Sequence, residues 1–437
     1  MKVAVVGTGH VGLVTASTLA FLGHEVVGLD NDPEKIRLLK EGTPPFFEPG
    51  LAELVADMKA SGRLTFAATM EDAVPGREVV FICVGTPARA SGEANLVAVE
   101  TAGREIAAQA TGRVLLVEKS TVPAGTARRL KTTLLRERPD LQADIGVASN
   151  PEFLREGKAI EDSLRPDRIL IGADDDWAFE TLRRLYEPLT SKGVALIETD
   201  IATAELSKHA SNAFLALKIS YANALARMCE KAGADVLAVA EVLGSDQRIG
   251  RAFLNAGLGY GGYCFPKDIQ AFERLAKSLG YDFPLLTEVV KINDEAVDAT
   301  VEKIRDALWN LEGKRIALLG LAFKPGTDDV RFAPALTLAG RLIEEGAVCA
   351  GYDPEAGEGA AKEVPALTIA STPYEAARGA HCIVICTEWD EFKALDLAKL
   401  KEVVDYPIIV DGRNVYDYDQ VEAAGFTYYP TGRPPRV

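Results

Sequence analysis

The segment GYGGYCFPKD, residues 259–268, places a cysteine between a glycine-rich stretch and two charged residues. Cys264 precedes Lys267 and Asp268 at a point where the pattern predicts the start of a helix. Helix N-terminal amides and a nearby ammonium both favour the nucleophilic thiolate form of a cysteine. Cys264 is therefore a candidate covalent nucleophile. The alternative is an inert, buried cysteine beside a helix cap, which is the more frequent state of a lone cysteine.

A glycine motif, GTGHVG, follows the first predicted strand and opens the first predicted helix. Gly7, Gly9 and Gly12 permit a tight turn and the close approach of a pyrophosphate to helix N-terminal amides. Asp30 ends the next predicted strand, where it can accept a hydrogen bond from a ribose hydroxyl and would repel a 2′-phosphate. This pattern favours NAD over NADP. The alternative is a glycine-rich turn in an α/β domain that binds no cofactor.

Two further pairs have the spacing of one helical turn. Lys208 and Asn212 lie on one face of a predicted long helix, where an ammonium and an amide could stabilise an oxyanion. A solvated helix face would show the same spacing. Glu152 and Glu156 follow a proline in NPEFLREG, and they fit either the first turn of a helix or a paired-carboxylate site. Spacing does not decide between these alternatives.

Two loops with the sequences CVGTP and KSTVP each follow a predicted strand. In one interpretation, they bring small hydroxyl residues to the carboxyl edge of a sheet, where ligands of open α/β sheets bind. In the other, they are simple turns in which proline and threonine have no role in binding.

The elements that must position these residues fall into three regions. Residues 1–200 alternate strands with helices, which predicts a mostly parallel sheet and an NAD-binding domain. Residues 201–300 show sustained helical spacing that begins with one long helix, so we expect an all-helical dimerisation region. Residues 301–437 return to strands and helices. The expected fold is α/β, with two Rossmann-like, doubly wound domains joined by the long helix.

Composition limits the classes of partner. The formal net charge of -16 argues against a nucleic-acid partner, because phosphate backbones require clustered lysine and arginine. No apolar run approaches the length needed to cross a bilayer, and the chain starts with a strand-like KVAVVG where a signal peptide would stand, so we expect a cytoplasmic protein without a membrane partner. The six cysteines and four histidines show no metal-ligand spacing, and no metal is expected.

In order along the chain, the sequence contains GTGHVG, VGTP, KSTVP, NPEFLREG, ELSKHASNAF, GSDQRIG, GYGGYCFPKD, LAFKPGTDDVR and DGR. This ordered set resembles the UDP-glucose 6-dehydrogenase family of nucleotide-sugar dehydrogenases over nearly the whole chain. The resemblance implies an N-terminal NAD domain, a homodimer built on the central helix, and a C-terminal domain that binds the UDP part of UDP-glucose.

The resemblance also assigns site residues. Cofactor contacts fall on Gly7, Gly9, His10, Val11, Gly12, Asp30, Lys35, Thr86, Thr121, Glu156, Lys267 and Arg331. Substrate contacts fall on Glu152, Phe153, Leu154, Lys208, Asn212, Phe253, Leu254, Asn255, Ala256, Gly257, Gly261, Lys324 and Arg413, with Arg248 reaching the site of the partner subunit. The catalytic set is Cys264, Lys208, Asn212, Asp268, Glu152 and Thr121.

The chemistry that follows is oxidation of the sugar C6 alcohol to an aldehyde by one NAD, and attack on that aldehyde by Cys264. A second NAD oxidises the thiohemiacetal to a thioester, which water hydrolyses to the uronate. Lys208 and Asn212 would stabilise the oxyanion, while Asp268, Glu152 or Thr121 would order water and protons.

Three alternatives stay open. A related dehydrogenase acting on GDP-mannose or a UDP-N-acetylhexosamine would use the same cysteine chemistry. A β-hydroxyacid dehydrogenase would share the N-terminal fold but would need neither Cys264 nor the second lobe. A non-catalytic NAD-sensing protein could retain both lobes. In the second lobe, Gly320 is followed by LAFKPG, without further phosphate-loop glycines, so we expect no second NAD there.

Overall fold

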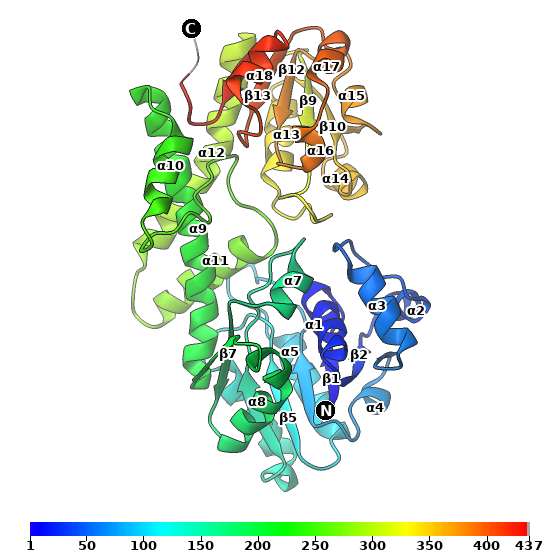
Figure 1. The fold of residues 1–437 in the computed structure, drawn as a ribbon. Helices are drawn as coiled ribbons and strands as arrows, with labels where there is room; N and C mark the ends of the chain where they lie inside the picture. The colour runs from blue at the N-terminus through cyan, green and yellow to red at the C-terminus, as the bar shows by residue number, and fades with distance from the viewer. Residues whose placement is uncertain (435–437) are drawn as a thin grey trace. The chain divides into compact units, whose positions relative to one another are not determined.

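The fold was analysed in a computed structural model that describes residues 1–434. It contains two sheets, each with helices on both faces (Figure 1). Residues 1–211 together with 270–279 form one compact unit, and the remaining described residues form the second.

The first sheet has the strand order β3-β2-β1-β4-β5-β6-β7-β8. All neighbouring strands are parallel except β6 and β7, which are antiparallel. The chain order reverses between β1 and β4, and ligands of such sheets bind at that switch point. The strands are β1 (Lys2–Val6), β2 (Glu25–Leu29), β3 (Leu64–Ala67), β4 (Val79–Ile82), β5 (Val114–Glu118), β6 (Ile145–Ser149), β7 (Arg168–Ala173) and β8 (Ala195–Thr199).

Successive side chains of β1 point to opposite faces of the sheet and pack into two separate hydrophobic cores. Val3 and Val5 pack on one face with α1, α3 and α8, and Ala4 and Val6 pack on the other face with α4, α5 and α6. The strand is apolar throughout because both of its faces are covered. The helices of this unit are α1 (His10–Phe21), α2 (Pro33–Glu41), α3 (Leu51–Ala60), α4 (Met70–Ala73), α5 (Val97–Gln109), α6 (Thr126–Glu137), α7 (Ala159–Leu164) and α8 (Asp176–Thr190).

The middle of the chain is helical, as predicted. Its first helix, α9, is one continuous element from Ile201 to Ala232 and is the green helix labelled α9 in Figure 1. The others are α10 (Val236–Ser245), α11 (Cys264–Ser278) and α12 (Pro284–Leu308).

The second sheet repeats the doubly wound order as β11-β10-β9-β12-β13-β14, and all its pairs are parallel. Ile316 and Leu318 of β9 pack on one face with α12, α13 and α14, whereas Ala317 and Leu319 pack on the other with α15 to α18. Its elements are β9 (Arg315–Leu319), α13 (Pro334–Glu344), β10 (Val348–Tyr352), α14 (Gly357–Glu363), β11 (Thr368–Ile369), α15 (Pro373–Ala376), β12 (Cys382–Ile385), α16 (Asp390–Lys393), α17 (Leu397–Val403), β13 (Ile408–Asp411), α18 (Tyr418–Ala423) and β14 (Thr427–Pro430). The predicted fold class is confirmed.

Candidate active site

The glycine loop after β1 leads directly into α1. Gly7 has a φ of 92°, and a Cβ there would lie 2.6 Å from the carbonyl oxygen of Cys83. A Cβ on Gly12 would lie 1.7 Å from the carbonyl oxygen of Gly7. Gly9, in contrast, would meet no atom within 4 Å, and no side chain caps the helix that follows it. Gly7 and Gly12 therefore shape the loop, while Gly9 leaves room for a pyrophosphate at the helix N-terminus.

Asp30 directly follows β2 and is a buried carboxylate with a fixed orientation. One of its oxygens accepts hydrogen bonds from the Thr8 amide at 2.9 Å and the Thr8 hydroxyl at 3.1 Å, and the other accepts from the Asp32 amide at 3.1 Å. The Lys35 ammonium lies 3.7 Å from the same carboxylate. Asp30 and Lys35 are thus together beside the glycine loop, in the position that suits recognition of a ribose hydroxyl.

The loops after β4 and β5 are joined at the same edge of the sheet, because the Thr86 hydroxyl donates to the Thr121 carbonyl at 3.0 Å. Glu205 of α9, which the sequence did not single out, accepts from the Ala127 amide at 2.9 Å at the start of α6. Burial raises the pKa of Glu205 to about 7. This carboxylate fixes the end of the loop that carries Thr121.

Lys208 and Glu152 form a buried ion pair, with Nζ 2.8 Å from a carboxylate oxygen. The other Glu152 oxygen accepts from the Leu154 amide at 2.7 Å. The segment 151–158 is irregular, so the interpretation of Glu152 and Glu156 as the first turn of a helix is wrong. Glu152 instead faces a lysine that lies far away in sequence, a contact that spacing does not reveal.

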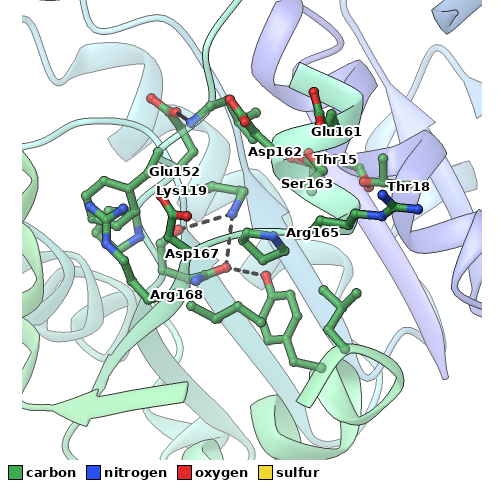
Figure 2. Close-up of a pocket in the computed structure, with 18 of the residues that line it drawn as sticks. Thr15, Thr18, Lys119, Glu152, Glu161, Asp162, Ser163, Arg165, Asp167 and Arg168 are labelled. Carbon is green, nitrogen blue, oxygen red and sulfur yellow. Dashed lines mark hydrogen bonds between the residues drawn. The ribbon is translucent and has the colours of Figure 1, made fainter. Parts of the chain in front are cut away.

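A polar cavity of about 270 Å³ lies next to this ion pair and is lined entirely by residues of the first unit (Figure 2). Glu152 lies on its wall, and the Lys119 ammonium donates to the Asn150 side-chain oxygen at 3.1 Å. Tyr186 donates to that same oxygen, and the Asn150 amide donates to the Leu170 carbonyl at 2.8 Å. Lys119, Asn150 and Tyr186 were not predicted as site residues; together they hold the base of the 150–157 loop.

Cys264 is the first residue of α11, and Asp268 lies one turn further along the same helix. The Asn212 amide and the Lys267 ammonium donate to the two Asp268 oxygens, each at 2.6 Å. Asn212, Lys267 and Asp268 are all buried, whereas Cys264 is half-buried. This network presents a carboxylate on the helix that begins with the candidate nucleophile.

Tyr263, immediately before Cys264, lies between two predicted cofactor cations. The guanidinium carbon of Arg331 lies 4.4 Å from the ring centroid, and the Lys267 ammonium lies 5.6 Å from it. Arg331 also forms an ion pair with Asp329 at 2.7 Å. The backbone is tightly packed here, because a Cβ on Gly261 would lie 2.3 Å from the Phe332 carbonyl oxygen.

Two predicted substrate residues, Gly257 and Arg413, come together in the second unit. A Cβ on Gly257 would lie 3.0 Å from an Arg413 guanidinium nitrogen, and the Gly257 amide donates to Asn223 at 2.8 Å. Arg413 itself donates to the Cys386 carbonyl at 2.9 Å. The same Cβ would lie 2.8 Å from the backbone carbonyl oxygen of Gly412, so the close packing of the backbone favours glycine at position 257.

The other predicted substrate residues of this unit are less concentrated. The Phe253 ring lies 6.4 Å from that of Phe265, and the Lys324 ammonium lies 5.2 Å from the Phe323 ring centroid. Leu254 and Ala256 are buried and Asn255 is exposed. Arg248 is 89% exposed and pairs with Asp246, so the described part of the chain does not bring it to the other predicted residues.

The turn after β9 in the second sheet differs from the glycine loop after β1. After β9 the chain turns at Gly320, and the next helix, α13, does not begin until Pro334. A Cβ on Gly320 would lie 1.8 Å from the Thr387 hydroxyl oxygen. Asp353, at the end of β10, accepts from the Leu321 and Ala322 amides at 2.7 and 3.0 Å. Asp353 therefore engages two amides of this turn, and the absence of a second NAD site stays a prediction.

Family models cover most of the chain in the same three regions. The NAD-binding domain of the UDP-glucose/GDP-mannose dehydrogenase family matches residues 1–190, its central domain residues 202–295, and its UDP-binding domain residues 317–418. The chain belongs to the UDP-glucose/GDP-mannose dehydrogenase family. The predicted family, the NAD cofactor and the assignment as an NAD-dependent dehydrogenase are thereby confirmed.

Individual relatives agree with this assignment. The chain is 47% identical to a UDP-glucose 6-dehydrogenase of Rhizobium meliloti strain 1021, over 99% of this chain and 100% of the relative. It is 44% identical to one of Bacillus subtilis strain 168, over 99% and 98%. Among solved structures, a UDP-glucose dehydrogenase from Pyrobaculum islandicum matches with a TM-score of 0.90 at 39% identity, covering 98% of this chain and 96% of that one.

Residues 1–434 contain no helix that is both long and apolar enough to span a bilayer. Within the same residues, no three His, Cys, Asp or Glu side chains gather in a way that could hold a metal ion.

Proposed function

We propose that this chain oxidises the C6 alcohol of UDP-glucose to the carboxylate of UDP-glucuronate, with two NAD molecules consumed in each turnover. The Rhizobium and Bacillus relatives, which carry the name of that activity, support this substrate over a GDP-sugar or a UDP-N-acetylhexosamine. The observation that carries the proposal is Cys264 at the start of α11, one turn before the buried Asp268 network.

NAD, when bound, accepts a hydride at each of the two oxidations. The residues that would hold it are the Gly7–Gly12 loop, Asp30 and Lys35, with Thr86 and Thr121 at the neighbouring strand ends. The fit rests on the open space in front of Gly9 and on the uncapped helix behind it.

The chain's own residues have distinct roles in this proposal. The Cys264 thiolate attacks the aldehyde carbon to form a thiohemiacetal, and oxidation of that adduct gives a thioester that water cleaves. Lys208 and Asn212 stabilise the oxyanion of the tetrahedral adducts. Asp268, Glu152 and Thr121 order the water and move protons.

The test is chemical. We expect two NADH for each UDP-glucose consumed, and no release of free aldehyde. Cys264→Ser should still form a first NADH but should accumulate enzyme-bound sugar and produce no uronate at steady state. Uronate production by this variant at the normal rate would overturn the covalent mechanism. A panel of UDP- and GDP-sugars, read by NADH formation, tests the sugar, and NAD binding without any NADH would identify a non-catalytic sensor.

We further propose that the chain forms a homodimer through α9. Phe214, Tyr221 and Met228 recur every seven residues, so they lie along one face of the helix, and they are 61%, 50% and 65% exposed. A stripe of large apolar side chains on a helix face indicates a protein interface. The high exposure of Arg248 suits the expected role in the site of the partner subunit. Light scattering of Tyr221→Glu should show a monomer if this stripe is the interface.

Two further predictions accompany the proposal. The chain divides into an NAD-binding domain over 1–200, a dimerisation region over 201–300 and a UDP-sugar-binding domain over 301–437. It works in the cytoplasm, and the six cysteines, which form no disulfide in the described residues, suit that reducing compartment.

A further inference from the structure

Glu48 is a buried carboxylate outside the predicted site, in the irregular segment between α2 and α3. It receives three hydrogen bonds. One oxygen pairs with His10 Nε2 at 2.8 Å and accepts from the Gly157 amide at 2.7 Å. The other accepts from the Ala159 amide at 2.8 Å. Its side chain is only 1% exposed, so these donors replace water completely.

The partners of Glu48 belong to two different ligand loops. His10 is the first residue of α1 and lies within the glycine loop that suits the NAD pyrophosphate. Gly157 ends the NPEFLREG segment, whose Glu152 pairs with Lys208, and Ala159 begins α7 directly after it. One side chain therefore joins the cofactor loop to the substrate loop, although the three segments are far apart in sequence.

Capping alone does not account for this arrangement. The two amides at positions 157 and 159 need only an acceptor at the start of α7, and a local serine or aspartate commonly supplies one. The contact with His10 adds nothing to that cap. Instead, the contact between His10 and Glu48 is a charge-assisted hydrogen bond when the imidazole is protonated. Such bonds are about twice as strong as hydrogen bonds between neutral groups.

The surroundings of His10 favour its protonated form. Burial opposes the charge, but the hydrogen bond to Glu48 and the charges of Glu156, Glu48 and Glu152 outweigh burial and raise the pKa of His10 above its ordinary value. The neighbouring ring of Phe46, with a centroid separation of 4.9 Å, carries no charge. The groups that face His10 are thus three carboxylates and one aromatic ring.

We propose that Glu48 is a positioning residue that couples NAD binding to UDP-glucose binding by holding His10 and the 152–157 segment in register. This inference rests on the proposed function. A nucleotide seated on the glycine loop fixes His10, which orients Glu48 and pre-orders the substrate loop. The coupling is reciprocal, so each ligand raises the affinity for the other by the same factor.

The test uses NADH with UDP-glucose, a pair that binds without reacting. In the wild-type chain we expect UDP-glucose to tighten NADH binding by about 5-fold or more. Glu48→Gln keeps the volume but removes the charge, and its coupling factor should fall close to 1. It should raise the KM for both ligands more than it lowers kcat. Glu53→Gln, an exposed glutamate on α3, is the matched control and should behave as wild type.

His10→Asn is the second variant, because it leaves both backbone donors on Glu48 and so preserves the cap. It should lose the coupling as Glu48→Gln does, and the double variant should be no worse than either single one. Wild-type coupling should fall as pH rises through the raised pKa of His10, and it should be independent of pH in His10→Asn. Undiminished coupling in either variant would overturn the inference. Failure of the proposed function would look different, because the wild-type chain itself would not bind UDP-glucose.

Discussion

The ammonium of Lys208 lies 2.8 Å from a carboxylate oxygen of Glu152, and both side chains are almost fully buried. Each charge is therefore stabilised by the other in a site with little water. Removing one partner of such a pair leaves a buried charge, which costs about 3–5 kcal/mol.

Lys208→Met should accordingly lower the free energy of unfolding by about 3–5 kcal/mol in denaturant titrations. Adding Glu152→Gln should restore part of that loss, because the remaining side chain is neutral. Activity should behave differently: loss of an oxyanion donor is expected to lower kcat by about 100-fold or more in both the single and the double variant. Recovery of kcat in the double variant would mean that Lys208 acts only through Glu152.

The network of Asn212, Asp268 and Lys267 permits an exchange experiment. Asp268→Asn places an amide opposite the donors and should lower kcat by about 100-fold or more, as expected for loss of a proton-transfer group. Asn212→Asp should be unstable because it sets two carboxylates 2.6 Å apart. Combining the two changes restores an amide–carboxylate pair, so the melting temperature should recover while kcat stays low. Full recovery of kcat would show that the position of the charge is unimportant.

Alanine substitutions at two glycines of the loop after β1 should distinguish a loss of folding stability from a loss of NAD affinity. A methyl group on Gly12 would lie 1.7 Å from a backbone oxygen, so Gly12→Ala should unfold or severely destabilise the first unit. Gly9→Ala meets no atom within 4 Å and should melt like wild type. It should nevertheless weaken NAD binding by about 10-fold or more, because the methyl occupies the space in front of the helix amides. Unchanged NAD affinity in Gly9→Ala would place the pyrophosphate elsewhere.

Glu118, buried at the end of β5, predicts a pH-dependent stability. Burial raises its pKa to about 8, so between its ordinary pKa and about pH 8 the folded chain holds a proton that the unfolded chain has released. The cost of burying it is therefore absent in acid and complete above about pH 8, and stability falls as pH rises through this window.

Glu118→Gln removes that titration. We expect the melting temperature of the variant minus that of the wild type to increase by several degrees as the pH is raised from about 5 to about 8.5. A stability difference of about 1 kcal/mol corresponds to about 2–4 °C. Glu105→Gln on the exposed side of α5 is the control and should show no such trend. A constant difference across this range would mean that Glu118 is charged throughout.

Much of the fold could be predicted from the sequence because the central strands of both sheets are buried on both faces. Strands such as VAVV and IALL are continuously apolar, and the glycine loop marks the first turn without ambiguity. The antiparallel pairing of β6 with β7 was not predicted, because an apolar sequence does not indicate in which direction a strand runs relative to its neighbour. The short β11 was also not predicted, since two residues are too few to show the alternating pattern of a strand.

The candidate site was harder to predict where it depends on distant contacts. The residues of α9 and of the GYGGYCFPKD segment stood out through type and spacing. Glu48 did not, because it lies in the irregular stretch TPPFFEPG and its partners are 38 to 111 residues away. Only tertiary structure shows that this glutamate, together with Asn150, holds the segments that contain the predicted site residues.

The amides after β9 are already bound by Asp353, which has a kinetic consequence. Because the Leu321 and Ala322 amides are engaged, we expect the pyrophosphate of NAD not to bind at the turn after β9 as it would at the glycine loop after β1. We therefore expect excess NAD not to compete with the sugar nucleotide at this turn. The rate at a low, fixed concentration of UDP-glucose should then rise to a plateau as NAD is increased, without inhibition at high NAD.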